Sequence, residues 1–310
     1  MTKKKKILVI LGGDSRERKV SLETGKACYK AIKRMGYKVK KFDPAKKFLS
    51  EIKKTNTDII FNALHGKNGE DGISQSYFEY LRIPYTHSGV ISSMTAMNKV
   101  LSKKIFVKKK ILTPKYIVLN KKNFEIKILK AILRKKKLTF PLVVKPISEG
   151  SSIGVKICKR LTQLHKEIQK LFREYNDLII EKFISGKEIQ VAVMNGKSLG
   201  AIELKPRRSF YDYKAKYSRS ARTIHIMPAE LKKNKYREVL TIAKKAHISL
   251  KCRGVTRSDF KFYNNKFYLL EINTQPGMTN LSLVPEIAKY IGINFKDLVE
   301  KILQDASINR

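Results

Sequence analysis

The sequence predicts an α/β protein in which a small parallel unit is followed by two strand-rich units. Short apolar runs alternate with helical stretches over roughly the first ninety residues, a pattern typical of parallel α/β units. A Gly/Ser-rich loop at 146–154 then separates two further apolar runs, 142–145 and 155–158. Four more strand-like segments follow residue 186. We therefore expect three domains with boundaries at 1–97, 98–185 and 186–310.

In the first unit, the apolar run Ile7–Leu11 predicts a buried strand that enters a tight loop at Gly12-Gly13. A helix is expected to begin near Ser21, a good N-cap residue, and to end at Gly36. The remaining strands predicted for this unit are Val39–Phe42, Asp58–Leu64 and Ile83–Thr86.

The second unit is expected to contain a helix over Leu161–Tyr175 and a strand over Leu178–Phe183, besides the two strands around the loop. The strands predicted for the third unit are Ile189–Met194, Ser198–Glu203, Val255–Phe262 and Phe267–Asn273. A final helix places Phe295, Leu298, Val299, Ile302 and Leu303 on one face, which indicates core packing.

Composition and charge disfavour several classes of protein. The net charge of +41 permits a nucleic-acid partner, but the lysines are spread along the whole chain, which favours an ordinary Lys-rich surface. Three scattered cysteines indicate neither a disulfide framework nor a zinc site. The N-terminal apolar run is too short for a signal peptide, and no run is long enough to span a bilayer. We expect a cytoplasmic protein without membrane segments or a specific nucleic-acid partner.

Acidic residues near the C-terminus form the strongest constellation. A strand over 255–260 puts Arg257 and Asp259 on one face, and a strand over 267–273 does the same for Glu271 and Asn273, with Leu270 and Ile272 on the other face. Two carboxylates and an amide oxygen suit Mg²⁺ that bridges phosphates. Two exposed acids on a hairpin would show the same spacing.

The loop of this hairpin decides whether the acids meet. If Asp259 lies directly opposite Glu271 in a regular ladder, Tyr263 pairs with Phe267 and the loop contains Asn264, Asn265 and Lys266. A two-residue Asn264-Asn265 turn would put the acids on opposite faces of a regular ladder. We therefore predict the three-residue loop.

Four other segments could line a site. The loop at 145–154 offers backbone N–H groups and a lysine to phosphates, although it fits no common phosphate-binding motif. The loop at 65–72 follows a strand of the first unit, where α/β sheets bind ligands. Residues 274–279 form a Pro-Gly turn with a free N–H at Gly277. Residues 205–222 are charged and aromatic, typical of either a surface loop or a lid.

Taken together, these segments resemble the D-alanine–D-alanine ligases of the ATP-grasp superfamily. The five matching segments occur in the family's order and span nearly the whole chain: 11–21, 63–72, 144–154, 210–217 and 270–279. The resemblance implies an ATP-grasp fold in which two subdomains hold ATP after an N-terminal α/β domain. It also implies formation of D-alanyl-D-alanine, a peptidoglycan precursor, by way of D-alanyl phosphate.

The resemblance implies the following site residues. The ATP phosphates would be bound by Lys99, Lys145 and Lys216, and adenine and ribose would be surrounded by Glu181, Phe183, Ile184 and Glu188. Two Mg²⁺ or Mn²⁺ ions would be held by Asp259, Glu271 and Asn273. The residues that bind the amino acids or take part in catalysis would be Glu17, His65, Ser151, Tyr217, Arg257, Gly277, Ser282 and Leu283.

Within these, Glu17 would anchor the ammonium of the first D-alanine, and Ser282 and Leu283 would line the second site. Tyr217 stands where relatives that make D-alanyl–D-lactate tend to carry Phe, which favours the dipeptide product. The sequence leaves open whether the substrate is another amino or hydroxy acid and whether the protein is a homodimer.

Overall fold

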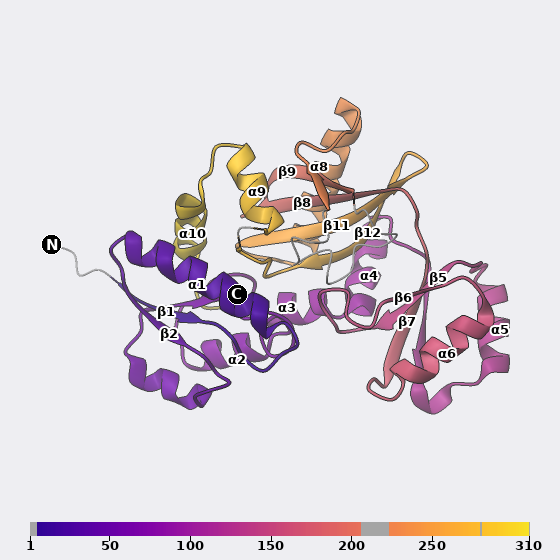
Figure 1. Cartoon of the computed structure of the whole chain (residues 1–310), viewed down its shortest axis with the longest axis horizontal. Coiled ribbons are helices and arrows are strands. Elements are labelled where there is room, and N and C mark those ends of the chain that lie inside the picture. Colours follow the sequence, from indigo (N-terminus) through magenta and orange to yellow (C-terminus); the bar gives the residue numbers. More distant parts are fainter. Residues whose placement is uncertain (1–4, 206–222, 280, 310) are drawn as a thin grey trace.

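The computed structural model describes residues 5–205, 223–279 and 281–309. Three sheets lie along the chain in sequence order, each covered by helices (Figure 1). The first is parallel and the other two are antiparallel, so the predicted mixed α/β class is confirmed. Within the described ranges, no helix is both long and apolar enough to cross a membrane.

The first sheet has the order β2-β1-β3, and its strands are β1 (Lys6–Ile10), β2 (Lys38–Phe42) and β3 (Ile59–Asn62). The segment predicted as a strand over Ile83–Thr86 forms only isolated bridges, from Tyr85 to Ile60 and to Ser307. Pro84 has no N–H to donate, which limits ladder formation there. The helices of this region are α2 (Ile73–Tyr80) and α3 (Val90–Met97), with a 3₁₀ turn at Leu49–Thr55.

Helix α1 (Arg18–Arg34) begins three residues before the predicted start. Ser21 does not cap it, because its hydroxyl accepts from the Gly12 N–H at 2.7 Å and donates to the Ala63 carbonyl at 2.8 Å. Ser21 therefore ties the helix to the loops after β1 and β3. The predicted C-terminal end agrees with the structure, since Gly36 adopts φ +82° just beyond the helix.

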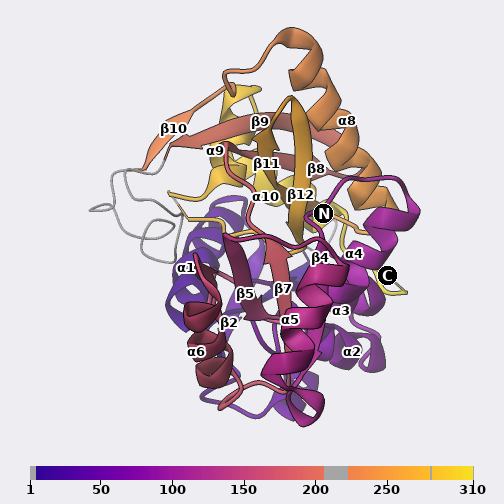
Figure 2. The same cartoon turned by 90° about the vertical axis from the view of Figure 1, so that its right-hand side faces the viewer.

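The second sheet has the order β4-β7-β5-β6. Its strands are β4 (Tyr116–Asn120), β5 (Leu142–Pro146), β6 (Lys156–Cys158) and β7 (Asp177–Lys182). Helices α5 (Ile126–Lys135) and α6 (Leu161–Leu171) cover one face and close a separate apolar core (Figure 2). Helix α4 (Lys99–Lys108) leads into this sheet, and a 3₁₀ turn, Lys121–Asn123, follows β4.

The third sheet has the order β10-β9-β8-β11-β12. Its strands are β8 (Lys187–Met194), β9 (Lys197–Lys205), β10 (Ile224–Ile226), β11 (Val255–Tyr263) and β12 (Lys266–Asn273). Helix α8 (Lys233–Ser249) packs on one face, and α9 (Leu283–Tyr290) packs on the other. Helix α10 (Phe295–Gln304) leaves this unit and packs against α1.

One apolar core therefore joins the first and third units. It contains Ile7 and Val9 from β1 together with Leu298, Val299 and Ile302 from α10. The apolar stripe predicted for the final helix thus packs in the core, but against the N-terminal unit.

The turn between β11 and β12 has two residues, so the predicted three-residue loop is wrong. Asn264 and Asn265 adopt φ +46° and +59°, which asparagine tolerates better than most residues and which suits a tight hairpin. Tyr263 pairs with Lys266 instead of Phe267.

A β-bulge nevertheless keeps the two acids together. The register shifts after Asp259, so that Phe260 pairs with Leu269 while Asp259 pairs with Glu271. Leu270 is the extra residue, and it lines the same cleft as Glu271 instead of facing away from it as expected. The extra residue compensates for the short turn and restores the register that the acids need.

Buried His247 should make the stability of the fold depend on pH. Burial lowers the pKa of His247 to about 4, while an unfolded histidine titrates near 6.5. As pH falls through this window only the unfolded chain gains a proton, so stability present above pH 6.5 is lost toward pH 4. The loss should reach roughly 3 kcal/mol.

Urea unfolding of wild type and His247→Gln at pH 7, 5.5 and 4.5 measures this loss. We expect a shallower decline in the variant, whereas His165→Gln, at a half-buried histidine of α6, should follow the wild type. Parallel declines in wild type and His247→Gln would contradict the assignment.

Candidate functional site

A cleft of about 790 Å³, open to solvent at its mouth, lies between the second and third sheets. Apolar side chains form a slot in it, among them Val143, Val155, Phe183, Ile184 and Leu270. The predicted polar residues that line it are Lys99, Lys145, Glu181, Glu188, Asp259 and Glu271.

A buried carboxylate with two lysines forms one wall of the cleft. Glu181 Oε1 lies 3.0 Å from Lys103 Nζ, and its Oε2 lies 2.9 Å from Lys145 Nζ. Burial acts to raise the pKa of Glu181, but the two lysines outweigh it and hold that pKa below its ordinary value. The carboxylate is therefore ionised at neutral pH.

Lys103 was not among the residues expected from sequence. Its side chain is fully buried, and burial lowers its pKa to about 8 despite Glu181. A signal was present, because Lys99 and Lys103 are four residues apart and share one face of α4. Lys261 was also missed, and its Nζ lies 2.9 Å from Glu188 Oε2 in the cleft.

Lys99 connects this wall with the acids of the hairpin. Its Nζ lies 3.5 Å from Glu271 Oε2 and donates to the Glu149 carbonyl at 2.5 Å. Its backbone N–H also donates to the Ile147 carbonyl, which ties the start of α4 to the β5–β6 loop. Burial lowers the pKa of Lys99, and Glu271 opposes this change.

The bulged hairpin gathers four polar side chains on one face. Asp259 lies opposite Glu271, and Arg257 lies opposite Asn273. Arg257 donates to both oxygens of Asp259, from Nε at 2.8 Å and from a terminal nitrogen at 3.0 Å. Cations thus balance both acids, Arg257 at Asp259 and Lys99 at Glu271.

The side-chain oxygens of the hairpin could supply some of the ligands that a hard divalent cation needs. Two facing carboxylates and the amide oxygen of Asn273 are the oxygen ligands that Mg²⁺ accepts, with phosphate oxygens completing the shell. Asn273 Oδ1 also accepts from the Gln275 N–H at 2.7 Å, which fixes its orientation. Among the described residues, no three His, Cys, Asp or Glu side chains cluster closely enough to hold a metal without other ligands.

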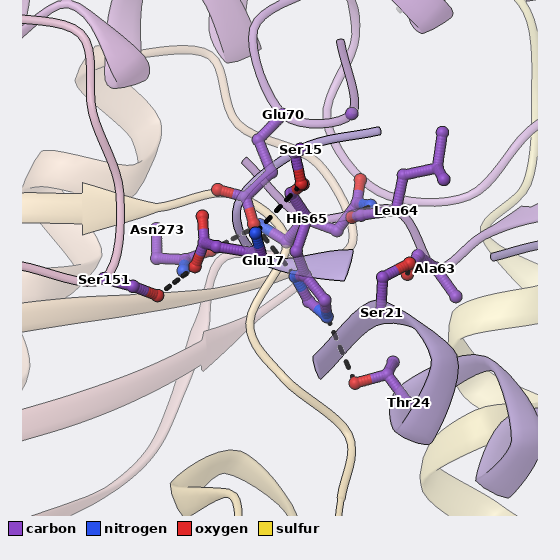
Figure 3. A network of polar contacts seen from close by, with 12 residues as sticks. Ser15, Glu17, Ser21, Thr24, Ala63, Leu64, His65, Glu70, Ser151 and Asn273 are labelled. Atoms are coloured by element: carbon purple, nitrogen blue, oxygen red, sulfur yellow. Dashed lines mark hydrogen bonds and ion pairs between the residues drawn. The ribbon is translucent and has the colours of Figure 1, made fainter. Parts of the chain in front are cut away.

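Glu17 lies where the first unit meets the β5–β6 loop (Figure 3). It is buried, and the Ser151 hydroxyl donates to its Oε1. Two glycines make room for its carboxylate: a Cβ atom on Gly66 would lie 2.7 Å from Oε2, and one on Gly150 would lie 2.6 Å from it. A second, narrower cavity, which is lined by Ser151, Arg257 and Glu271 among others, adjoins this contact.

His65 is held at the base of the same region (Figure 3). Its Nδ1 lies 2.9 Å from Glu70 Oε1, and its Nε2 lies 3.1 Å from Thr24 Oγ1. Because a carboxylate oxygen accepts, we assign a proton to His65 Nδ1 in its contact with Glu70. His65 links α1 to the loop 65–72, and Thr24, which also accepts from the Met278 N–H, links α1 to the loop 274–279.

The loop 274–279 is fixed to the first unit by buried amides. Asn62 Nδ2 donates to Gln275 Oε1 at 2.9 Å, and Gln275 Nε2 donates to the Leu64 carbonyl. A Cβ atom on Gly277 would lie 2.9 Å from Ser282 Oγ, so glycine permits this close approach. Ser282 accepts from the Thr279 N–H.

Not every expected residue faces a cavity. Leu283 packs in the core that joins the first and third units. Lys216 and Tyr217 lie outside the described residues.

A chain of polar contacts that sequence reasoning missed connects two units at the mouth of the site. Arg16 lies 2.6 Å from Glu174 and 3.4 Å from the Tyr175 hydroxyl, which donates to Glu149 Oε1 at 3.0 Å. Burial and the nearby Glu149 raise the pKa of Tyr175 to about 12, so the phenol keeps its proton. Arg16 is distant in sequence from Glu149, Glu174 and Tyr175, so no local sequence pattern predicts these contacts.

The chain resembles known ligases over nearly its whole length. Two family models match it, one described as the D-ala D-ala ligase N-terminus over residues 40–88 and one as its C-terminus over residues 105–304. It is 58% identical over 306 residues to the D-alanine–D-alanine ligase of Pelagibacter ubique strain HTCC1062, with 99% of each chain covered.

Solved structures agree with these matches. The D-alanine–D-alanine ligase from Bacillus anthracis complexed with ATP superposes with a TM-score of 0.85 at 34% identity, over 98% of this chain and 97% of that one. A D-Ala:D-Ser ligase from Enterococcus faecalis gives a TM-score of 0.84 at 26% identity, over 97% and 99% of the two chains.

Proposed function

This chain belongs to the D-alanine–D-alanine ligase family, and from that premise we propose how its residues divide the work of the reaction. It is an ATP-dependent ligase with the ATP-grasp fold, and it joins two D-alanine molecules into the dipeptide that peptidoglycan precursors need. The facing pair of Asp259 and Glu271 at the edge of the cleft is the observation that best supports the division of roles below.

We propose that the cleft binds ATP with its base in the apolar slot. Glu181, Phe183 and Ile184 would surround adenine, and Glu188 would accept from the ribose hydroxyls. Lys99 and Lys145 would reach the phosphates, which requires each to loosen its present carboxylate partner. Phosphate is a strong enough acceptor for that exchange.

The acids of the hairpin would hold Mg²⁺ or Mn²⁺. Asp259, Glu271 and Asn273 supply hard oxygen ligands, and ATP phosphates would supply others. When bound, the metal neutralises charge that builds up on the phosphates during transfer. If Asp259 turned from Arg257 to the metal, the Arg257 guanidinium would be available to stabilise the negative charge on the oxygen of the tetrahedral intermediate.

The amino-acid site would lie between Glu17 and the loop 274–279. Glu17 would pair with the ammonium of the first D-alanine, with Ser151 and His65 fixing its surroundings. The Gly277 N–H would join Arg257 at the oxyanion. The second D-alanine would lie near Ser282. Leu283 would contribute through packing, since its side chain faces the core.

The reaction then follows from positioning. The carboxylate of the first D-alanine attacks the γ-phosphorus of ATP, forming D-alanyl phosphate and releasing ADP. The amine of the second D-alanine, after losing a proton, attacks the acyl carbon, and inorganic phosphate leaves. Oriented substrates and fixed charges supply most of the rate enhancement for such steps. Roles for Lys216 at the γ-phosphate and Tyr217 beside Ser151 rest on the family pattern alone.

Other features of the chain stay predictions. The division at 97 and 185 is one of them, and because α10 shares a core with α1, we propose that the outer units move together. A cytoplasmic location, where ATP is abundant, is also expected, and a homodimeric assembly stays open.

The choice of substrate is tested by coupled ADP release with Mg²⁺ and a panel of D- and L-amino acids and D-lactate. D-Alanine alone should give the fastest turnover and D-alanyl-D-alanine as product. The structural similarity to a D-Ala:D-Ser ligase makes D-serine the informative competitor. If another acid reacted fastest, the enzyme would be a ligase with a different product. Salt-dependent DNA binding without ADP release would instead favour a nucleic-acid-binding protein.

The metal role of Glu271 is tested by Glu271→Gln. An amide keeps the shape but removes the charge, so turnover should fall roughly 100-fold or more and need more Mg²⁺. Steady-state rates across a Mg²⁺ titration measure both effects. Glu238→Gln, on the exposed face of α8, serves as the control, and near-normal kinetics of Glu271→Gln would remove this residue from the metal site.

The position of the Glu17 carboxylate is tested by Gly150→Ala. The added methyl would displace the carboxylate, so the KM for the first D-alanine should rise and kcat/KM should fall roughly 10- to 100-fold. Gly196→Ala is the control: its Cβ meets no atom within 4 Å, and its φ of +72° predicts only a loss of stability. Unchanged D-alanine kinetics in Gly150→Ala would separate Glu17 from the amino-acid site.

A further inference from the structure

Lys103 lies behind the wall of the cleft, next to Glu181, and the reaction above assigns it no role. Its side chain is fully buried and does not line the cleft. Its Nζ lies 3.0 Å from Glu181 Oε1 and donates to Thr113 Oγ1 at 2.6 Å. A lysine is almost never fully buried unless it is paired, so any effect of Lys103 on a ligand must pass through Glu181.

The two lysines on Glu181 are not equivalent. Lys145 lines the cleft and holds Oε2, whereas Lys103 holds Oε1 from behind the wall. When Lys145 turns to a phosphate, Oε2 is released toward the cleft. Lys103 then keeps the carboxylate charged and in place, which spares the cost of an unpaired buried charge.

Apolar side chains line the slot beside Glu181. Val143, Val155 and Leu270 are among them, and Phe183 adds an aromatic side chain that a purine ring could pack against. An ionised carboxylate can only accept hydrogen bonds. Adenine carries an amino donor at position 6, whereas hypoxanthine carries a carbonyl oxygen there and would face the carboxylate with repulsion.

We propose that Lys103 is a positioning residue for base selection: it fixes Glu181 so that the released oxygen accepts from the amino group of adenine and rejects 6-oxopurines. The inference rests on the proposed binding of ATP in this cleft. It adds a determinant of nucleotide specificity that makes no contact with the nucleotide.

Equilibrium binding of ADP and of IDP, each with MgCl₂, tests the proposal by calorimetry on the full chain. Wild type should prefer ADP, and Lys103→Met should reduce the ADP-to-IDP affinity ratio roughly tenfold. Glu181→Gln should reduce it similarly, because an amide can donate to the 6-oxo group. The matched control is Lys104→Met, which removes the exposed neighbouring lysine of α4 and should leave the ratio unchanged.

The double variant Lys103→Met/Glu181→Gln decides whether Lys103 acts through Glu181. It removes both charges of the buried Lys103–Glu181 pair, so it keeps the test available if Lys103→Met does not fold. Its ratio should equal that of Glu181→Gln. A further change in the double variant, or a wild-type ratio in folded Lys103→Met or in Glu181→Gln, would overturn the proposal. Nucleotide binding without dipeptide formation would contradict the ligase reaction and leave this test intact.

Discussion

Mutual neutralisation of buried charges at the central cleft is the constraint on which the site depends. Three lysines and two glutamates approach one another where water is largely excluded, and isolated charges there would be too costly to bury. Each ammonium is therefore held by a carboxylate, and in the proposed complex only Lys99 and Lys145 exchange that partner for phosphate. This explains how a chain with a net charge of +41 keeps its binding site close to balance, because the excess cations lie elsewhere on the surface.

Residues far apart in sequence reach the site because buried polar groups tie their loops together. The loops after β1 and β3 are joined through Ser21. The loop after β12 is attached to helix α1 by Thr24 and to the loop after β3 by Gln275. Such fully paired networks favour one arrangement over its alternatives. The β5–β6 loop meets this framework at Glu17 through Ser151, so the proposed amino-acid and nucleotide regions share a border.

Local patterns predicted most of the strands, including the two that carry the acids, because period-two alternation and Gly-rich breaks depend on near neighbours. They failed where tertiary contacts override the local pattern. Ser21 looked like a helix cap but serves to join two loops. The bulge at Leu270 could not be read from sequence, although the requirement that Asp259 face Glu271 was correct. Lys103 was missed because its partner, Glu181, is distant in the chain.

The placement of α10 against α1 has a consequence for synthesis. The parallel sheet is made first, but part of its apolar covering comes from Leu298, Val299 and Ile302. Until the ribosome has released these residues, that side of the nascent sheet stays exposed, and early segments of large proteins in this state are prone to aggregate. The second unit has a core made of its own residues, so it can fold while translation continues. The core shared by the first and third units can close only after α10 has been synthesised.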